Sequence, residues 1–289
     1  MKRIFLFTFT NLSVIILLYF TINLICLYKN LYFIKNNVNY IFYIAILIGF
    51  LGSIISLFTS KFIAKKAFNL RIIKSEYNLN KNEKWILEKT SDLSKKFKIK
   101  VPEIAIYKGS PNAFAVGAFK NYSLIALSTG IMQIMNEEEI IAVLSHELAH
   151  ISNGDMITLS LMKGIINTFV IFFSRFIGYI FDKVIFKNEN GLGFFYLITT
   201  IILEITLGFF ASIILAWFSR KREYKADLDA TLVMKKKEPM INALLRLKNL
   251  KIVEIKNFQN FGIVGKIKIR SIFNTHPSIS KRINAIKKN

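Results

Sequence analysis

Two of the three histidines in this 289-residue chain, His146 and His150, stand four residues apart, with Glu147 directly after the first. On a helix, residues four apart lie on one face, so both imidazoles can direct a nitrogen at one metal ion. Glu147 points beside that ion, where it can take a proton from a water molecule whose pKa zinc lowers. The pattern therefore predicts one catalytic Zn²⁺ per chain, with His146 and His150 as ligands and Glu147 as general base.

A catalytic zinc needs a third protein ligand and one open position. The single cysteine, Cys26, lies in an apolar run, which leaves an acid or the third histidine, His276. In "SRKREYKAD" Glu223 and Asp227 are again four apart, so Glu223 could bind the ion while Asp227 accepts a hydrogen bond from a ligand histidine. By spacing alone, these two acids fit a solvated helix face as well.

His276 stands before Pro277 and Ser278, which are typical of the start of a last helix. It has two interpretations. It is either a turn residue or a donor to the oxyanion that forms during hydrolysis, with Arg282 nearby as a second positive group.

Sequence signals mark the helix that carries the two histidines. Asn136 is a predicted N-cap with Glu139 three residues on, and Gly154 marks the end of the helix. Three short strands are predicted before it, parted by Gly, Pro and Asn turns, at residues 103–107, 113–119 and 123–128. A charged helix over 83–96 precedes the strands, and lysine-rich helices follow from about residue 219.

The chain is 53% hydrophobic, which indicates a membrane protein. Four apolar segments are long enough to cross a bilayer. The third segment has an alternative interpretation, because it also fits an amphipathic helix that lies on the membrane surface. The first is too long for the core of a signal peptide and is read as an uncleaved anchor. The segments cover residues 4–28, 38–60, 157–181 and 192–218.

Basic residues set the expected topology and partners. A lysine-rich stretch after Lys61 predicts a cytoplasmic face there, since positive loops are retained on that side. The net charge of +22 fits a surface against anionic lipid better than nucleic acid, because no basic, aromatic-interleaved RNA-binding pattern is present. The expected domains are two membrane helices in 1–60, a cytoplasmic part in 61–156, a membrane hairpin in 157–218 and a second cytoplasmic part in 219–289.

The predicted hairpin carries two charges of opposite sign, Arg175 and Glu204. If both segments span, their depths differ by roughly 6 Å at 1.5 Å per residue. An unpaired charge inside a bilayer is costly, so we expect these two side chains to form an ion pair.

Several motifs together resemble the HtpX family of membrane zinc metalloproteases, which is related to the type I CAAX prenyl endopeptidases. In chain order they are "PNAFAVG" (111–117), "HELAHISNGD" (146–155), an apolar pair, "SRKREYKAD" (219–227) and "THPSISKRI" (275–283). The family often has glycine where Ala149 stands. The resemblance implies a mostly α-helical membrane protein with four transmembrane helices and a zincin-like α+β catalytic domain.

The same resemblance implies roles for particular residues. It makes Glu223 the third zinc ligand, leaves Asp227 behind a ligand histidine, and places His276 by the scissile bond. It also gives meaning to the strand that begins near Asn112, Ala113 and Phe114, which could pair with an extended substrate. The alternative for that strand is a core position.

The function implied is a zinc endopeptidase of the inner membrane, with its active site in the cytoplasm. It would cleave membrane or unfolded proteins in membrane-protein quality control under stress. Two alternatives stay open: a membrane scaffold or transporter with a structural metal, and a processing peptidase for lipidated peptides. Nothing in the sequence indicates an oligomeric state.

Overall fold

The computed structural model describes residues 32–74, 79–188, 191–259 and 276–288. The predicted membrane segment 4–28 lies outside the described residues. Two compact units emerge from the contacts within the chain. The helical unit comprises the described residues up to Ser56 together with Thr158–Leu215, and the second unit comprises Leu57–Ile157 and the described residues from Ala216 onward.

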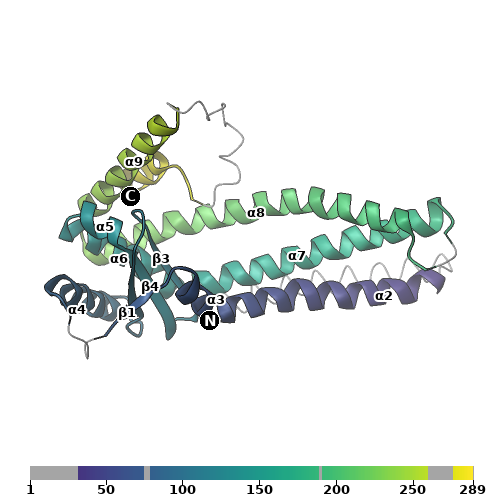
Figure 1. Ribbon diagram of the computed structural model, residues 1–289, viewed down its shortest axis with the longest axis horizontal. Coiled ribbons are helices and arrows are strands. Elements are labelled where there is room, and N and C mark those ends of the chain that lie inside the picture. The colour runs from purple at the N-terminus through teal and green to yellow at the C-terminus, as the bar shows by residue number, and fades with distance from the viewer. Residues whose placement is uncertain (1–31, 75–78, 189–190, 260–275, 289) are drawn as a thin grey trace. The chain divides into compact units, whose positions relative to one another are not determined.

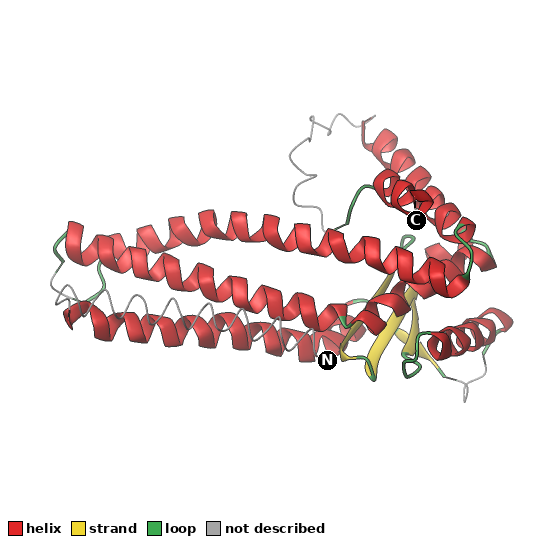
Figure 2. Ribbon diagram, turned by 180° about the vertical axis from the view of Figure 1, so that it is seen from behind, coloured by secondary structure: helices red, strands yellow, loops and turns green. Residues whose placement is uncertain are grey.

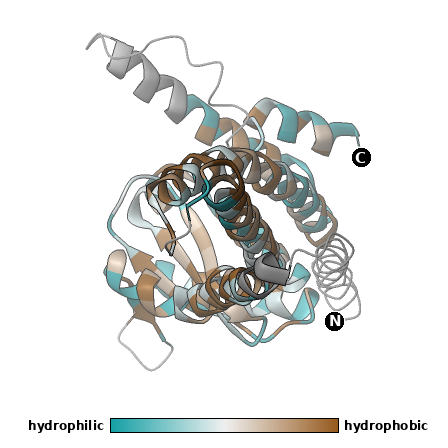
Figure 3. Ribbon diagram, turned by 90° about the vertical axis from the view of Figure 1, so that its right-hand side faces the viewer, coloured by the Kyte–Doolittle hydropathy of each residue, from teal (hydrophilic) through white to brown (hydrophobic). Residues whose placement is uncertain are grey.

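The helical unit contains long apolar helices that run side by side (Figures 1 and 2). They are α2 (Tyr32–Ile46), the first turn of α3 (Gly52–Ala67), most of α7 (Asp155–Ile180) and the first part of α8 (Phe194–Met234). Short π-helical segments follow α2 and α7, at Leu47–Leu51 and Phe181–Ile185. Figure 3, which looks along these helices, shows them largely hydrophobic. Among the described residues, three helical stretches are long and apolar enough to cross a membrane: Asn39–Ala67, Asp155–Ile185 and Phe194–Met234.

Small residues let the helices of this unit approach closely. A Cβ atom added at Gly49 would lie 2.6 Å from the backbone nitrogen of Thr168, so only glycine fits there. Nearby, the Ser160 hydroxyl donates to the Ser53 carbonyl at 2.9 Å. Such small and hydroxylated residues are typical of contacts between membrane helices.

The predicted pair within the hairpin is present. Arg175 Nη1 on α7 donates to Glu204 Oε1 on α8 at 2.6 Å. Each charge therefore has a partner of opposite sign within an apolar helical layer, as the high cost of an unpaired charge requires.

The second unit contains a four-stranded mixed sheet in the order β1-β2-β4-β3. The three predicted strands are confirmed as β2 (Glu103–Tyr107), β3 (Ala113–Phe119) and β4 (Tyr122–Ser128). β4 pairs parallel to β2 and antiparallel to β3, so β3 has a neighbour on one side only among the described strands. The sequence reading missed β1 (Arg71–Ile73), whose three residues are too short for an alternating pattern.

Helices complete this unit, and the one that carries the histidines has the predicted limits. α6 (Glu137–Asn153) begins with a capping box between Asn136 and Glu139 and ends at Gly154, whose φ of 68° is in the left-handed region. α6 shares a hydrophobic core with the sheet and the neighbouring helices. Those helices are α4 (Lys81–Lys96), α5 (Thr129–Ile134), the end of α8, α9 (Glu238–Gln259) and α11 (Ile279–Lys288).

One boundary differs from the expectation. The fourth apolar segment was expected to end near residue 218, with separate helices after it, but α8 continues without a break to Met234. No glycine or proline lies between 209 and 234, so nothing in that stretch interrupts the helical hydrogen bonds. As a result, Glu223 and Asp227 stand on the same helix as the apolar segment.

Candidate metal centre and active site

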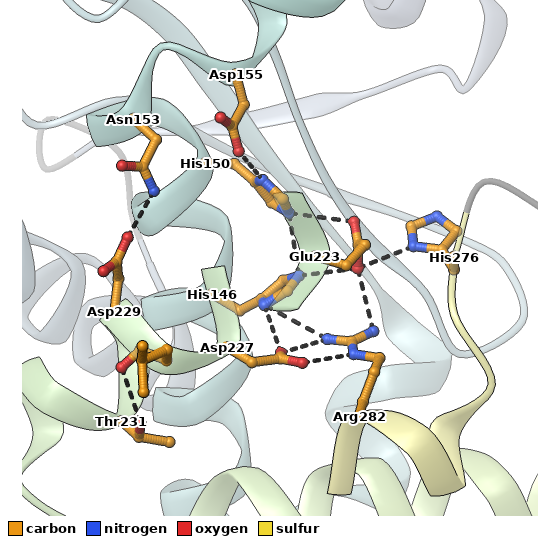
Figure 4. Close-up of polar contacts among 11 residues, drawn as sticks. His146, His150, Asn153, Asp155, Glu223, Asp227, Asp229, Thr231, His276 and Arg282 are labelled. Atoms are coloured by element: carbon orange, nitrogen blue, oxygen red, sulfur yellow. Dashed lines mark hydrogen bonds and ion pairs between the residues drawn. The ribbon is translucent and has the colours of Figure 1, made fainter. Parts of the chain in front are cut away.

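Helices α6 and α8 bring three metal-binding side chains to one point (Figure 4). The Nε2 atoms of His146 and His150 lie 3.1 Å apart. Glu223 Oε2 lies 3.6 Å from His146 Nε2, and Glu223 Oε1 lies 3.4 Å from His150 Nε2. All three side chains offer ligand atoms within 4.8 Å of one another, although 73 residues separate His150 from Glu223.

The Nδ1 atoms of both histidines, which point away from the shared point, lie next to carboxylates. Asp227 Oδ1 lies 3.0 Å from His146 Nδ1, which is the arrangement expected for Asp227. Asp155 Oδ2 lies 2.6 Å from His150 Nδ1. A carboxylate at Nδ1 favours the tautomer with its proton on that atom, so the Nε2 lone pair is free for a metal ion.

Sequence reasoning missed the position of Asp155. The sequence feature that could have indicated this role is the place of Asp155 directly after Gly154. Gly154 ends α6, and Asp155 is the first residue of α7. Arg222 Nε lies 3.1 Å from Asp155 Oδ1, and this arginine was also missed because it stands within a basic run. Each histidine is thus backed by a carboxylate that has a cationic neighbour.

Arg282, which was expected as a second positive group near His276, contacts two carboxylates, those of Asp227 and Glu223. Its guanidinium donates to both oxygens of Asp227, with Nη2–Oδ1 at 2.5 Å and Nε–Oδ2 at 2.7 Å. Its third nitrogen, Nη1, lies 3.2 Å from Glu223 Oε2. Such a two-pronged contact fixes the carboxylate in place, so Arg282 orients Asp227 behind His146.

The residues present fit a zinc ion. Glu223 is 4% exposed, and its Oε2 atom accepts no hydrogen bond from the described part of the chain. His276 Nδ1 lies 3.0 Å from this oxygen without forming a hydrogen bond with it. A buried carboxylate oxygen without a donor is costly, and a cation between the three side chains would satisfy it. Two imidazoles and one glutamate are a ligand set of catalytic zinc.

The electrostatics of the cluster favour a cation. Burial lowers the pKa of His150, but hydrogen bonds to Asp155 and Glu223 outweigh it and raise the pKa to about 10. Burial also lowers the pKa of His146, yet its contacts with the carboxylates of Asp227 and Glu223 leave that pKa raised. The carboxylates therefore stabilise positive charge at this point, whether on a proton or on a metal ion, and metal binding would displace the protons.

A cavity of about 210 Å³ opens beside the cluster. His146, Glu147 and Glu223 line it together with His276, whose side chain is 66% exposed. Glu147 is buried, and the group of possible metal ligands found among the described residues does not include it. Its carboxylate therefore borders the space in which a water and a substrate would meet, beside the ligands.

Two of the three residues expected to bind the substrate backbone line the same cavity. Asn112 and Ala113, at the start of β3, line the cavity. Phe114 does not, because its ring packs against Phe68 and Tyr107 with centroids 5.0 and 5.7 Å apart. Successive side chains of a strand point to opposite faces, which accounts for the difference.

Comparisons with known proteins agree with this geometry. The fold is similar to the crystal structure of S. mikatae Ste24p, with a TM-score of 0.58 and 15% identity over 99% of this chain and 67% of that one. Residues 80–289 match peptidase family M48. The protease HtpX homolog of Bordetella petrii is 47% identical over 99% of this chain and 98% of its own, and that of Polaromonas naphthalenivorans is 46% identical with the same coverage.

Fold and site together define a zinc metallopeptidase with membrane helices. The family match covers residues 80–289, and the likeness to the Bordetella petrii relative extends over nearly the whole chain. The chain belongs to peptidase family M48, as an HtpX homologue.

Proposed function

We propose that this chain is a membrane-bound zinc endopeptidase that cleaves exposed segments of membrane or misfolded proteins. The observation that carries the proposal is the convergence of His146, His150 and Glu223 at one point, with Glu147 in the lining of the cavity that His146 and Glu223 also border. One Zn²⁺ per chain would be held by those three ligands. Zinc, when bound, supplies a water of lowered pKa and polarises the peptide carbonyl.

The other steps belong to residues of the chain. Glu147 takes the proton of the attacking water and passes it to the leaving amine. Asp227 and Asp155 hold the two histidines in the tautomer that binds metal. His276, exposed at the rim of the cavity, donates a hydrogen bond to the oxyanion.

Strand β3 supports a mode of substrate binding. One edge of β3 pairs with no described strand, and Asn112 and Ala113 lie at the cavity. Both features favour pairing with an extended substrate backbone, which would carry the scissile carbonyl to the ligands. An exposed, unstructured segment can adopt this geometry, whereas a folded one cannot. This is the reason to propose unfolded or membrane-extruded segments as substrates.

We further propose the cellular setting. The chain would have four transmembrane helices, including segment 4–28, in the inner membrane, and the zincin-like catalytic parts 61–156 and 219–289 would face the cytoplasm, because basic residues follow Lys61. The family resemblance implies a role in membrane-protein quality control.

The test compares wild type with Glu147→Gln, purified in detergent, for zinc content and for cleavage of unfolded casein. We expect the variant to keep its zinc and to lose activity by about 10²- to 10⁴-fold, the usual contribution of a general base. Glu138→Gln is the matched control, since Glu138 stands on the same helix with its side chain 66% exposed. Equal cleavage by wild type and Glu147→Gln would favour a scaffold with a structural metal.

A further inference from the structure

The cavity beside the metal ligands is lined by polar and by apolar side chains. The polar ones include His146, Glu223 and Glu147. Six of the apolar ones, which we call the apolar wall, are Ile131, Val143, Met240, Ala243, Leu244 and Leu247. The proposed chemistry uses polar residues only, so the apolar wall needs a separate explanation.

The apolar wall follows from helical spacing. Met240, Ala243, Leu244 and Leu247 recur every three or four residues, so they form one stripe along α9. Val143 stands four residues before Glu147 and lies on the same face of α6. One helical turn of about 5.4 Å therefore separates the general base from the apolar wall. A group held against this wall would lie next to the reacting bond.

The size of the cavity limits what can enter. Pockets that hold drug-sized ligands have about 300 to 1,000 Å³, whereas this one has about 210 Å³. That space suits one large side chain and its backbone. A charged side chain entering here would lose its hydration against aliphatic groups that offer no hydrogen bond, which is unfavourable.

We propose that the apolar wall is a specificity pocket, which selects a large apolar side chain next to the scissile bond of the substrate. The inference rests on the proposed peptidase function and adds the class of sequence that is cut. Buried helices of membrane and misfolded proteins expose such side chains when they unfold, so the pocket would direct cleavage to segments that are normally hidden.

Leu247 offers a direct way to change the pocket. It is half-buried at the edge of the hydrophobic core and lines the cavity, so a larger ring at this position can occupy the space without replacing a fully buried residue. Leu245 is the matched control. It stands two residues away on the same helix, is 40% exposed, and borders a different hollow together with Arg246.

The experiment digests unfolded casein with zinc-loaded wild type, Leu247→Phe and Leu245→Phe, and maps the cleaved bonds by mass spectrometry. For wild type we expect Leu, Phe, Met and Ile to be enriched about 10-fold over charged residues at one of the two positions that flank the cut, as a hydrophobic pocket allows. Leu247→Phe should shift this preference toward Ala and Val. Leu245→Phe should cut where wild type cuts.

Two results would overturn the inference while leaving the peptidase proposal intact: cleavage without any preference at the flanking positions, or the same preference in wild type and Leu247→Phe. Absence of casein cleavage by the zinc-loaded wild type would instead contradict the proposed function, and the specificity pocket with it. A circular dichroism melt of each variant checks that the folded state is retained.

Discussion

In the helical unit, Arg175 and Glu204 meet at 2.6 Å, and the two charges satisfy each other. In the second unit, Glu223 is surrounded by His146, His150, His276 and Arg282, yet its Oε2 atom accepts no hydrogen bond within the described residues. We call the first arrangement a closed pair, because each charged group is bonded to the other. We call the second an open cluster, because one of its carboxylate oxygens accepts no hydrogen bond from the described residues. Closed polar contacts hold helices together, whereas an open one is suited to a ligand that brings its own charge.

The largest effect is expected where the open cluster loses a ligand. Glu223→Ala removes one of three metal donors, so zinc affinity should fall by more than about 100-fold, beyond the effect usual for residues behind the ligands. Zinc content after dialysis and casein cleavage measure this. Glu223→Ala should lose both zinc and cleavage, whereas Glu147→Gln should lose cleavage and keep its zinc. Full zinc content in Glu223→Ala would remove this residue from the ligand set.

A smaller effect is expected behind the ligands. Asp155→Asn keeps the shape of the side chain but weakens the contact that orients His150. Zinc affinity should fall by about 10- to 100-fold, as is usual for such partners of ligand histidines. Competition with a chromophoric chelator measures the affinity. Asn153→Ala is a nearby control, because its side chain donates a hydrogen bond to Asp229. Equal affinities in wild type and Asp155→Asn would contradict the orienting role.

The closed pair should respond to substitution in the opposite way. Arg175→Leu or Glu204→Leu leaves one charge unpaired among apolar helices, which should cost about 2 to 3 kcal/mol. The double variant should recover most of this loss, and zinc content should be unchanged in all three. Thermal unfolding in detergent compares the variants. A double variant less stable than both single variants would show that the pair contributes more than mutual charge compensation.

The smallest effect is expected at a closed pair near the surface. A hydrogen bond from Arg71 lowers the pKa of Glu83 below its usual 4.5, against the opposing effect of burial. Because the folded-state pKa is depressed, this stabilisation is present above pH 4.5 and is lost as the pH falls through the lowered pKa. Arg71→Gln should therefore reduce stability at neutral pH by less than about 1 kcal/mol.

The measurement for this surface pair is a urea titration of wild type and Arg71→Gln at several pH values, in the presence of chelator so that zinc does not contribute. The difference between the two proteins should shrink as the solution is acidified. A difference that grows toward acid would contradict the depressed pKa of Glu83.

Local signals made much of this structure predictable. The capping box at Asn136, the left-handed Gly154 and the three longer strands follow from residue types within a few positions of each other, and all are present. The pair between Arg175 and Glu204 followed from helical rise and the cost of unpaired charge, without knowledge of the fold.

Contacts distant in sequence were harder to predict. Asp155 and Arg222 are 67 residues apart, and nothing in either local sequence indicates that they meet behind His150. The apolar wall of the cavity likewise depends on α5, α6 and α9 lying together, which only tertiary packing determines. Glu223 needed the family resemblance, because an acid in a basic run fits a solvated face equally well.

The central claim is that His146, His150 and Glu223 hold one catalytic zinc while Glu147 stands beside it. Anomalous diffraction at the zinc edge from zinc-loaded Glu147→Gln crystals tests it directly. The account predicts one peak about 2.0 to 2.2 Å from both Nε2 atoms and a Glu223 oxygen. A peak outside this cluster, or none in a variant that keeps its fold, would contradict the account.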